Sequence, residues 1–223
     1  MTRLVTDNPP QTTRTGNLIV MKINNALART ILFCMLCFSA TAGAKQVLVF
    51  GDSLSAGYGM TLQQGWVHLL RERLVRHNIS VVNGSVSGEI TANGAKRLPG
   101  VLARENPDLV IIELGANDGL RGMRLDAMYS NLNQMIQQSL QSNARVLLLG
   151  MKIPPNYGPQ YTEQFHAVYT RLATQYDIAF VPFFLEKVME QANLFQSDNI
   201  HPNAAAQSLL LETVWPEVSA LVF

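Results

Sequence analysis

Short runs of apolar residues alternate with longer amphipathic stretches along most of the chain. The runs are rich in valine, isoleucine and leucine and contain few interspersed polar residues, which is typical of strands buried on both faces of a parallel sheet. They occupy residues 46–50, 79–83, 108–114, 145–151 and 178–183. We therefore predict about five parallel strands, each followed by a polar loop.

The stretches between the runs have the spacing of helices. In residues 65–77 the apolar side chains recur every three or four positions and would share one face of a helix. The same spacing predicts helices over residues 90–105, 124–143, 162–177 and 203–223, and Pro99 is expected to kink or interrupt the first of these. Because strand and helix alternate, the simplest fold is a three-layer α/β/α sandwich around a parallel sheet.

Residues 1–44 do not follow this pattern. Within residues 21–44, two basic residues precede a short apolar run at residues 31–40, and the stretch ends in Ala-Gly-Ala. This order predicts a secretory signal peptide that is cleaved after Ala44. The run is shorter than the roughly 20 residues that a membrane-spanning helix needs, although an uncleaved N-terminal anchor is an alternative.

Cleavage after Ala44 would leave residues 45–223 as a single domain, periplasmic or secreted, with no stable membrane anchor. Both cysteines, Cys34 and Cys37, would be removed, so the mature chain would have no disulfide, thiol nucleophile or thiolate metal site. The sequence leaves open whether translation starts at Met1 or Met21, since a signal peptide normally lies at the very N-terminus.

The composition excludes some classes of partner. The chain has 223 residues, of which 48% are hydrophobic, and a formal net charge of +1. These values are typical of one globular domain and give no reason to expect nucleic acid or an anionic surface as a partner. They say nothing of the oligomeric state.

The loops at the predicted carboxyl ends of the strands contain candidate catalytic residues. Ser53 follows the first strand, Gly88 the second and Asn117 the third, while Asp198 and His201 precede the last helix. Ligands of parallel sheets bind at this edge. A serine hydroxyl needs a base such as His201 to take its proton, and Asp198 could hold the other ring nitrogen of that histidine. The set is therefore sufficient for acyl transfer.

A tetrahedral intermediate also needs hydrogen-bond donors at its oxygen. The N–H of Gly88 is open to a close ligand, the Asn117 side chain can donate, and the N–H of Ser53 is a third donor. Other readings stay open at this point. Ser53 could cap a helix, Asn117 could belong to an ordinary turn, and Asp198 with His201 could form a surface turn.

The segments "FGDSLS", "SVSGE", "GAND" and "DNIHP", in this order, resemble the four sequence blocks of the SGNH/GDSL hydrolase superfamily. The similarity is greatest to the bacterial periplasmic branch of acyl-CoA thioesterase I, arylesterase and lysophospholipase L1 proteins, and it covers nearly the whole mature chain. Glu89 and Ala116 stand where that branch often has Asp and Gly.

The resemblance implies a flavodoxin-like fold and an enzyme that needs no metal or cofactor. It implies that Ser53 is the nucleophile, that His201 is the base and that Asp198 orients the histidine. The oxyanion hole would consist of Ser53, Gly88 and Asn117.

We expect small-molecule acyl esters and thioesters as substrates, with Met123 and Ile153 lining an apolar groove for the acyl chain. Tyr157 lies in the same proline-rich loop as Ile153 and is a further candidate. Two alternatives remain: a carbohydrate O-acetylesterase of the same superfamily, and a non-catalytic lipid-binding protein.

Overall fold

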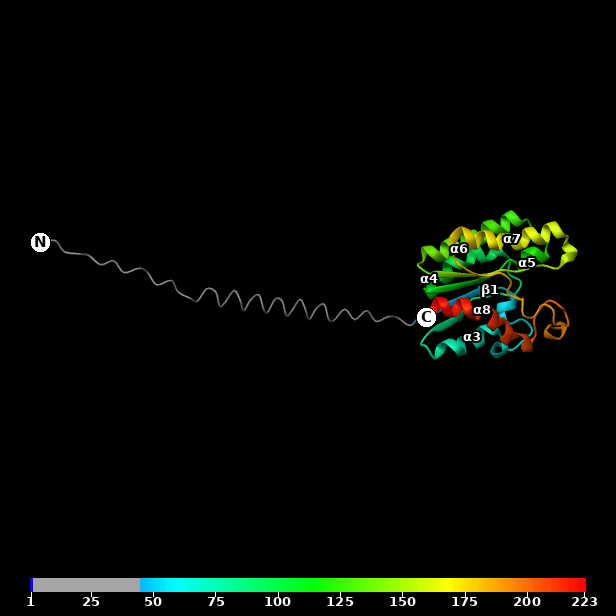
Figure 1. The fold of residues 1–223 in the computed structure, drawn as a ribbon, viewed down its shortest axis with the longest axis horizontal. Helices are drawn as coiled ribbons and strands as arrows, with labels where there is room; N and C mark the ends of the chain where they lie inside the picture. Colours follow the sequence, from blue (N-terminus) through cyan, green and yellow to red (C-terminus); the bar gives the residue numbers. More distant parts are fainter. Residues whose placement is uncertain (2–44) are drawn as a thin grey trace. The chain divides into compact units, whose positions relative to one another are not determined.

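The computed structural model describes Met1 and residues 45–223 (Figure 1). The signal peptide predicted within residues 1–44 therefore lies outside the described part of the chain. Residues from 45 onward form one compact unit. Within that unit no helix is both long enough and apolar enough to cross a membrane.

The centre of the fold is a parallel sheet of five strands in the order β2-β1-β3-β4-β5. The strands are β1 (Gln46–Gly51), β2 (Ser80–Asn83), β3 (Leu109–Glu113), β4 (Arg145–Leu149) and β5 (Ala179–Val181). The order reverses between β1 and β3, which is where ligands bind in flavodoxin-like folds. The predicted α/β sandwich with a flavodoxin-like sheet is confirmed.

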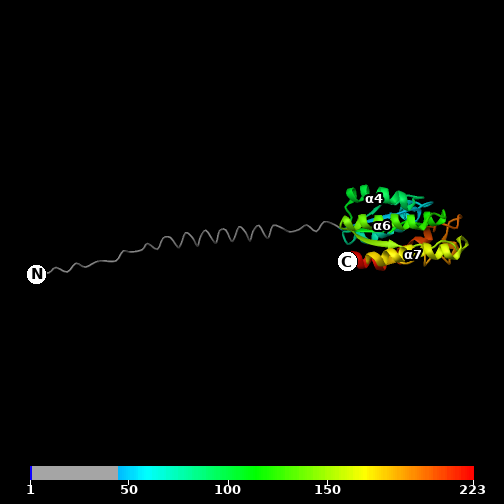
Figure 2. The same cartoon turned by 90° about the horizontal axis from the view of Figure 1, so that it is seen from above.

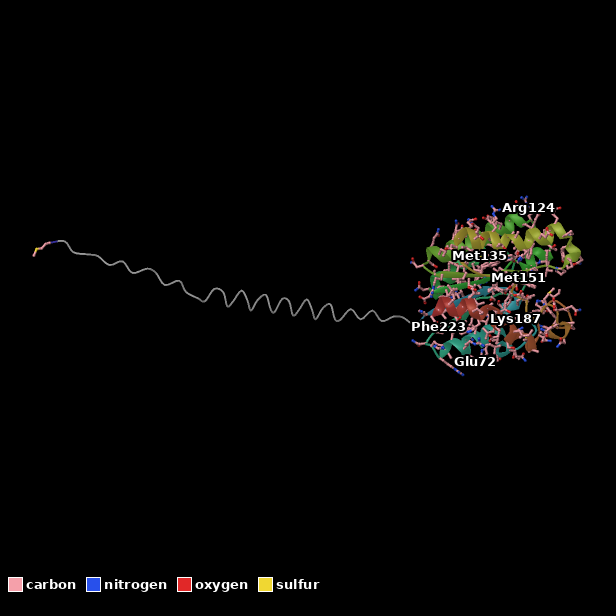
Figure 3. The ribbon with its side chains drawn as sticks, in the orientation of Figure 1. Glu72, Arg124, Met135, Met151, Lys187 and Phe223 are labelled. Carbon is pink, nitrogen blue, oxygen red and sulfur yellow. The ribbon has the colours of Figure 1, made fainter. Side chains whose placement is uncertain are left out.

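Helices cover both faces of the sheet. Figure 1 shows α4 (Thr91–Glu105), α6 (Leu125–Gln141) and α7 (Pro159–Tyr176) on one face, and α3 (Trp66–Val75) with α8 (Gln207–Val222) on the other. Seen from above, α4, α6 and α7 lie side by side (Figure 2). Glu72 and Arg124, labelled in Figure 3, mark the two outer surfaces of this sandwich.

The core lies between these layers and the central strands. All five residues of β3 are buried, whereas β2 and β5 keep partly exposed residues because they lie at the edges of the sheet. Burial on both faces, predicted for every strand, thus holds for the central strands only.

Of the two effects expected of Pro99, a kink or an interruption of its helix, the interruption does not occur. Helix α4 continues through Pro99. Proline has no N–H, so it cannot bond the carbonyl of the residue four positions earlier. That carbonyl, on Ala95, instead accepts a hydrogen bond of 3.4 Å from the Gln138 side chain on α6. The neighbouring helix therefore satisfies the group that the proline leaves free.

The chain enters and leaves the domain at the edge of the sheet where the strands begin. The Lys45 ammonium donates to the Val222 carbonyl at 2.6 Å, which ties the start of β1 to the end of α8. The loops that follow the strands gather at the opposite edge.

Candidate active site

Ser53 lies at the carboxyl end of the central strand β1. It is the first residue of the short helix α2 (Ser53–Ala56) and is half-buried. The side chain that caps this helix is Asp52, whose Oδ1 accepts from the Leu54 N–H at 3.1 Å. The capping role that the sequence left open for Ser53 thus belongs to its neighbour, and the Ser53 hydroxyl is available for other contacts.

His201 links Ser53 to Asp198. Its Nε2 lies 2.8 Å from Ser53 Oγ, and its Nδ1 lies 2.7 Å from Asp198 Oδ2. Because the carboxylate can only accept, Nδ1 carries a proton and Nε2 of the neutral ring faces the hydroxyl as an acceptor. The structure therefore brings Ser53 to a histidine 148 positions later in the chain, which in turn contacts Asp198 three positions before it. Such a line of contacts is what a nucleophile, its base and an orienting acid require.

The Asp198 carboxylate also organises its own turn. Its Oδ1 accepts from the N–H groups of His201 at 3.0 Å and Ile200 at 2.9 Å. The pKa of Asp198 is lowered from 3.8 to about 2. The hydrogen bond from the His201 N–H has the largest effect, and the His201 ring and the Ile200 N–H add to it. Asp198 consequently stays ionised across the acid and neutral range, where it can stabilise a protonated His201 ring.

A second loop holds the other side of the histidine. The Tyr58 ring lies against the His201 ring, with 4.5 Å between the ring centroids. The Gln196 side chain donates to the Tyr58 carbonyl at 2.8 Å, and the Gln196 N–H donates to the His201 carbonyl at 2.8 Å. Sequence reasoning missed both residues, since Tyr58 and Gln196 are distant in the chain and belong to no chemical motif.

Besides the Ser53 N–H, the predicted oxyanion donors lie in two other loops. Asn117 is in the first turn of α5 (Ala116–Leu120), and its Nδ2 donates to Asp52 Oδ2 at 2.9 Å. Gly88 is exposed, with a positive φ of 77° that favours glycine. Its neighbour Glu89 is held by Arg97 through two bonds of 2.9 and 2.5 Å. The Gly88 turn is thus fixed from the residue beside it.

Ser53, Asn117 and His201 face one cavity of about 440 Å³, whose lining does not include Gly88. Most of its lining is apolar. The lining includes Leu120, Met151, Ile153, Leu185, Met189 and Phe195, together with the charged residues Lys152 and Glu190. A cavity of this size and character can accept a hydrocarbon chain beside the Ser53 hydroxyl.

Of the three residues predicted to bind the acyl chain, only Ile153 lines this cavity; Met123 and Tyr157 lie outside its lining among the described residues. Two tyrosine hydroxyls bond to the backbone of the loop that contains Met123. The Tyr157 hydroxyl donates to the Leu120 carbonyl, and the Tyr161 hydroxyl donates to the Met123 carbonyl, each at 2.8 Å. Tyr157 therefore holds the loop that contains Leu120 and Met123.

Two buried carboxyl groups adjoin the site and were not recognised as a pair in the sequence. Burial raises the pKa of Asp52 from 3.8 to about 6. Burial, and then the charge of Asp52, raise the pKa of Glu113 well above its ordinary value. Within residues 45–223, no cluster of three or more histidine, cysteine, aspartate or glutamate side chains is placed to hold a metal ion.

Most of the domain matches a known protein family. The model of the GDSL-like lipase/acylhydrolase family matches residues 49–209. The chain belongs to this family. The resemblance that the four sequence blocks indicated is thereby confirmed.

The similarity of this GDSL-like acylhydrolase to its relatives extends over nearly the whole length of those relatives. The chain is 47% identical over 199 residues to the esterase TesA of Pseudomonas aeruginosa, which covers 88% of this chain and 99% of the relative. It is 38% identical over 205 residues to thioesterase 1/protease 1/lysophospholipase L1 of Escherichia coli, covering 91% and 98%. A crystal structure of TesA matches the fold with a TM-score of 0.77 at 50% identity, covering 80% of this chain and 100% of that one.

Proposed function

We propose that the protein is an exported serine hydrolase that cleaves acyl esters and thioesters through an acyl-enzyme. The observation that carries the proposal is the line of contacts from Ser53 Oγ to His201 Nε2 at 2.8 Å and from His201 Nδ1 to Asp198 Oδ2 at 2.7 Å. The names of the relatives, an esterase and a thioesterase/lysophospholipase, support the same bond types.

In the first half of the reaction, Ser53 Oγ attacks the acyl carbon while His201 Nε2 takes the hydroxyl proton. The charge on the carbonyl oxygen is stabilised by N–H donors: the backbone of Ser53 and Gly88 and the side chain of Asn117. Asp198 stabilises the imidazolium. The intermediate collapses when His201 gives its proton to the departing alcohol or thiol, which leaves the acyl group on Ser53.

The second half repeats these steps with water as the nucleophile. His201 takes a proton from a water molecule, which attacks the acyl carbon of the Ser53 ester. As the intermediate collapses, His201 returns this proton to Ser53 Oγ and the carboxylic acid is released. The same donors stabilise the second intermediate. The residues named for these steps account for all four proton transfers and for the developing charge.

The decisive experiment is turnover of p-nitrophenyl esters from acetate to palmitate by the purified protein and its Ser53→Ala variant. We expect turnover that is lost in the variant, with an unchanged circular dichroism spectrum, and that is greatest for medium or long acyl chains. Activity confined to acetate would instead favour a carbohydrate O-acetylesterase. Full activity of Ser53→Ala would contradict the assignment of the nucleophile, and absence of activity in both proteins would favour a lipid-binding protein.

The proposed role of the cavity in binding the acyl chain can be tested separately, through the preference for chain length. Ile153 is 7% exposed and lines the cavity, so Ile153→Asp places a charge where the acyl chain would lie. We expect kcat/KM for octanoate relative to acetate to fall by about 10-fold or more. The control is Val86→Asp at an exposed position outside the lining. An unchanged chain-length preference in Ile153→Asp would rule out this cavity as the acyl site.

A further inference from the structure

A fully buried carboxyl group at the end of β3 has no part in the reaction as described. Glu113 Oε2 accepts from the Ser55 hydroxyl at 2.7 Å and from the Asp52 N–H at 3.3 Å. Its Oε1 has no hydrogen-bond partner within residues 45–223, although it is buried. A buried polar atom without a partner is destabilising, so this glutamate calls for an explanation other than stability.

The backbone of β1 leaves room for this carboxyl group. A Cβ atom at Gly51 would lie 2.6 Å from Glu113 Oε2 and 2.9 Å from the Glu113 carbonyl oxygen. Any side chain at position 51 would therefore displace the carboxyl group from the Asp52 N–H. Gly51 lies beside Glu113 in the sheet, and the loop that contains Ser53 follows Gly51 directly.

The Asp52 side chain extends this contact to the oxyanion site. Asp52 Oδ1 accepts from the Leu54 N–H, and Oδ2 accepts from Asn117 Nδ2 at 2.9 Å. A carboxylate can only accept, so it keeps the nitrogen of the Asn117 amide, and not its oxygen, turned toward it. That nitrogen has a second hydrogen for the substrate. A reversed amide would turn its oxygen toward Asp52 and withdraw this donor.

We propose that Glu113 is a positioning residue for the hydrolysis: by accepting from the Asp52 N–H and the Ser55 hydroxyl, it fixes the Asp52 carboxylate that orients the Asn117 amide. The inference rests on the proposed function, in which Asn117 donates to the oxyanion. The direction of the pKa values agrees with it: burial, and then the charge of Asp52, raise the pKa of Glu113 well above its ordinary value, whereas Asp52 has a pKa of about 6. Negative charge in the buried pair is therefore favoured on Asp52, the residue that faces Asn117.

The test is a double-mutant cycle between Glu113 and Asn117, with kcat and KM measured on p-nitrophenyl butyrate. Glu113→Met keeps the length of the side chain but removes the acceptor, and we expect kcat to fall by about 10-fold or more with KM nearly unchanged. In the Asn117→Ala background the same substitution should change kcat by less than about 2-fold. Losses that multiply in the double variant would overturn the proposal, because Glu113 would then act independently of Asn117.

Conservative variants separate positioning from folding. Glu113→Gln keeps an oxygen that can accept both hydrogen bonds and should retain kcat near that of the wild type; a loss equal to that of Glu113→Met would overturn the proposal. If Glu113→Met does not fold, Asp52→Asn tests the same link. Its amide oxygen must face Leu54, so its nitrogen faces Asn117 and reverses that amide. We expect kcat to fall in the wild type but not further in Asn117→Ala, and an equal fall in both backgrounds would overturn the inference.

Matched serines provide a control. Ser55 and Ser139 are both buried and both donate through their hydroxyls, but the partner of Ser139 is the Met135 carbonyl within α6. Ser55→Ala should lower kcat, whereas Ser139→Ala should lower only the melting temperature; equal kcat values for the two variants would overturn the inference. Ser53→Ala is measured beside them. If Ser53→Ala stays active, the proposed function itself fails. If Ser53→Ala is inactive but the kcat losses of Glu113→Met and Asn117→Ala multiply in the double variant, only the inference about Glu113 is refuted.

Discussion

At the scale of single residues, two aspartates beside the serine have opposite surroundings. Asp198 is exposed and accepts from N–H groups of its own turn, which lower its pKa. Asp52 is 1% exposed, and its burial outweighs the hydrogen bonds from Leu54 and Asn117, so its pKa rises to about 6. The first aspartate is suited to holding a charge beside an imidazolium, and the second holds its charge at a cost in stability.

The Asp52 carboxyl group should make the stability of the fold depend on pH. Between its ordinary pKa of 3.8 and its folded value of about 6, the native state keeps a proton that the unfolded state releases. The contribution of Asp52 to the free energy of unfolding is therefore complete below the ordinary pKa and falls as pH rises through this window, by up to about 3 kcal/mol.

Urea unfolding of the wild type and Asp52→Asn at about pH 4.5 and 6.5 measures this contribution. We expect the difference in unfolding free energy, wild type minus variant, to be smaller at the higher pH. A difference that grows with pH would show that Asp52 is stabilised as a carboxylate, contrary to the burial that surrounds it.

At the scale of elements, the turn from β3 into α5 is packed without spare space. Gly115 has a φ of 118°, and a Cβ atom there would lie 2.3 Å from the Tyr169 hydroxyl oxygen and 2.8 Å from Met128 Cε. The same hydroxyl donates to the Leu114 carbonyl at 3.0 Å. Helix α7 thus holds the start of α5, and with it Asn117.

Gly115→Ala should lower the free energy of unfolding by more than about 2 kcal/mol, because it adds both a collision and backbone strain. Gly122→Ala is the control: Gly122 also has a positive φ, of 61°, but nothing lies within 4 Å of a Cβ atom there. The Gly122→Ala substitution should lower the free energy of unfolding by only about 1 kcal/mol. Equal losses in the two variants, measured by urea unfolding, would mean that the contact with Tyr169 adds nothing.

The elements themselves were largely predictable from the sequence, and the contacts between their loops were not. Each apolar run corresponds to a strand. Burial on both faces accounts for the runs in the centre of the sheet, whereas β2 and β5 lie at its edges. The continuation of α4 through Pro99 could not be predicted, because the hydrogen bond to the Ala95 carbonyl comes from Gln138, a side chain of another helix. Tyr58 was missed for the same reason, since its contact with His201 exists only once the chain has folded.

Glu113 did leave a signal in the sequence that could have been used. It is a charged residue near the end of the apolar run 108–114, and it proves to be fully buried. A carboxyl group in a buried strand needs donors nearby, and Ser55 and the Asp52 N–H supply them. Identifying those donors requires the register of β1 against β3, where Gly51 lies beside Glu113.

At the scale of the whole molecule, the predicted cleavage after Ala44 has a direct test. Lys45 is the first residue of the predicted mature chain, and its backbone and side chain already bond within the domain, to Ser80 and Val222. When the full-length gene is expressed in a bacterium with an export system, we expect the protein in the periplasm or medium, with Lys45 as its N-terminal residue. Edman sequencing checks this, and an intact N-terminus on membrane-bound protein would indicate an anchor instead.

The contact between Lys45 and Val222 has a consequence for how the chain can be arranged. The two ends of the domain meet at the edge of the sheet where the strands begin, whereas Ser53 and His201 lie where the strands lead into their loops. A short linker could therefore join the ends, and the ring could be reopened at the turn of residues 142–144, which precedes β4. Such a circular permutant would place the serine segment after the histidine segment in the chain. The site depends on where the loops meet in space and does not depend on their order along the chain.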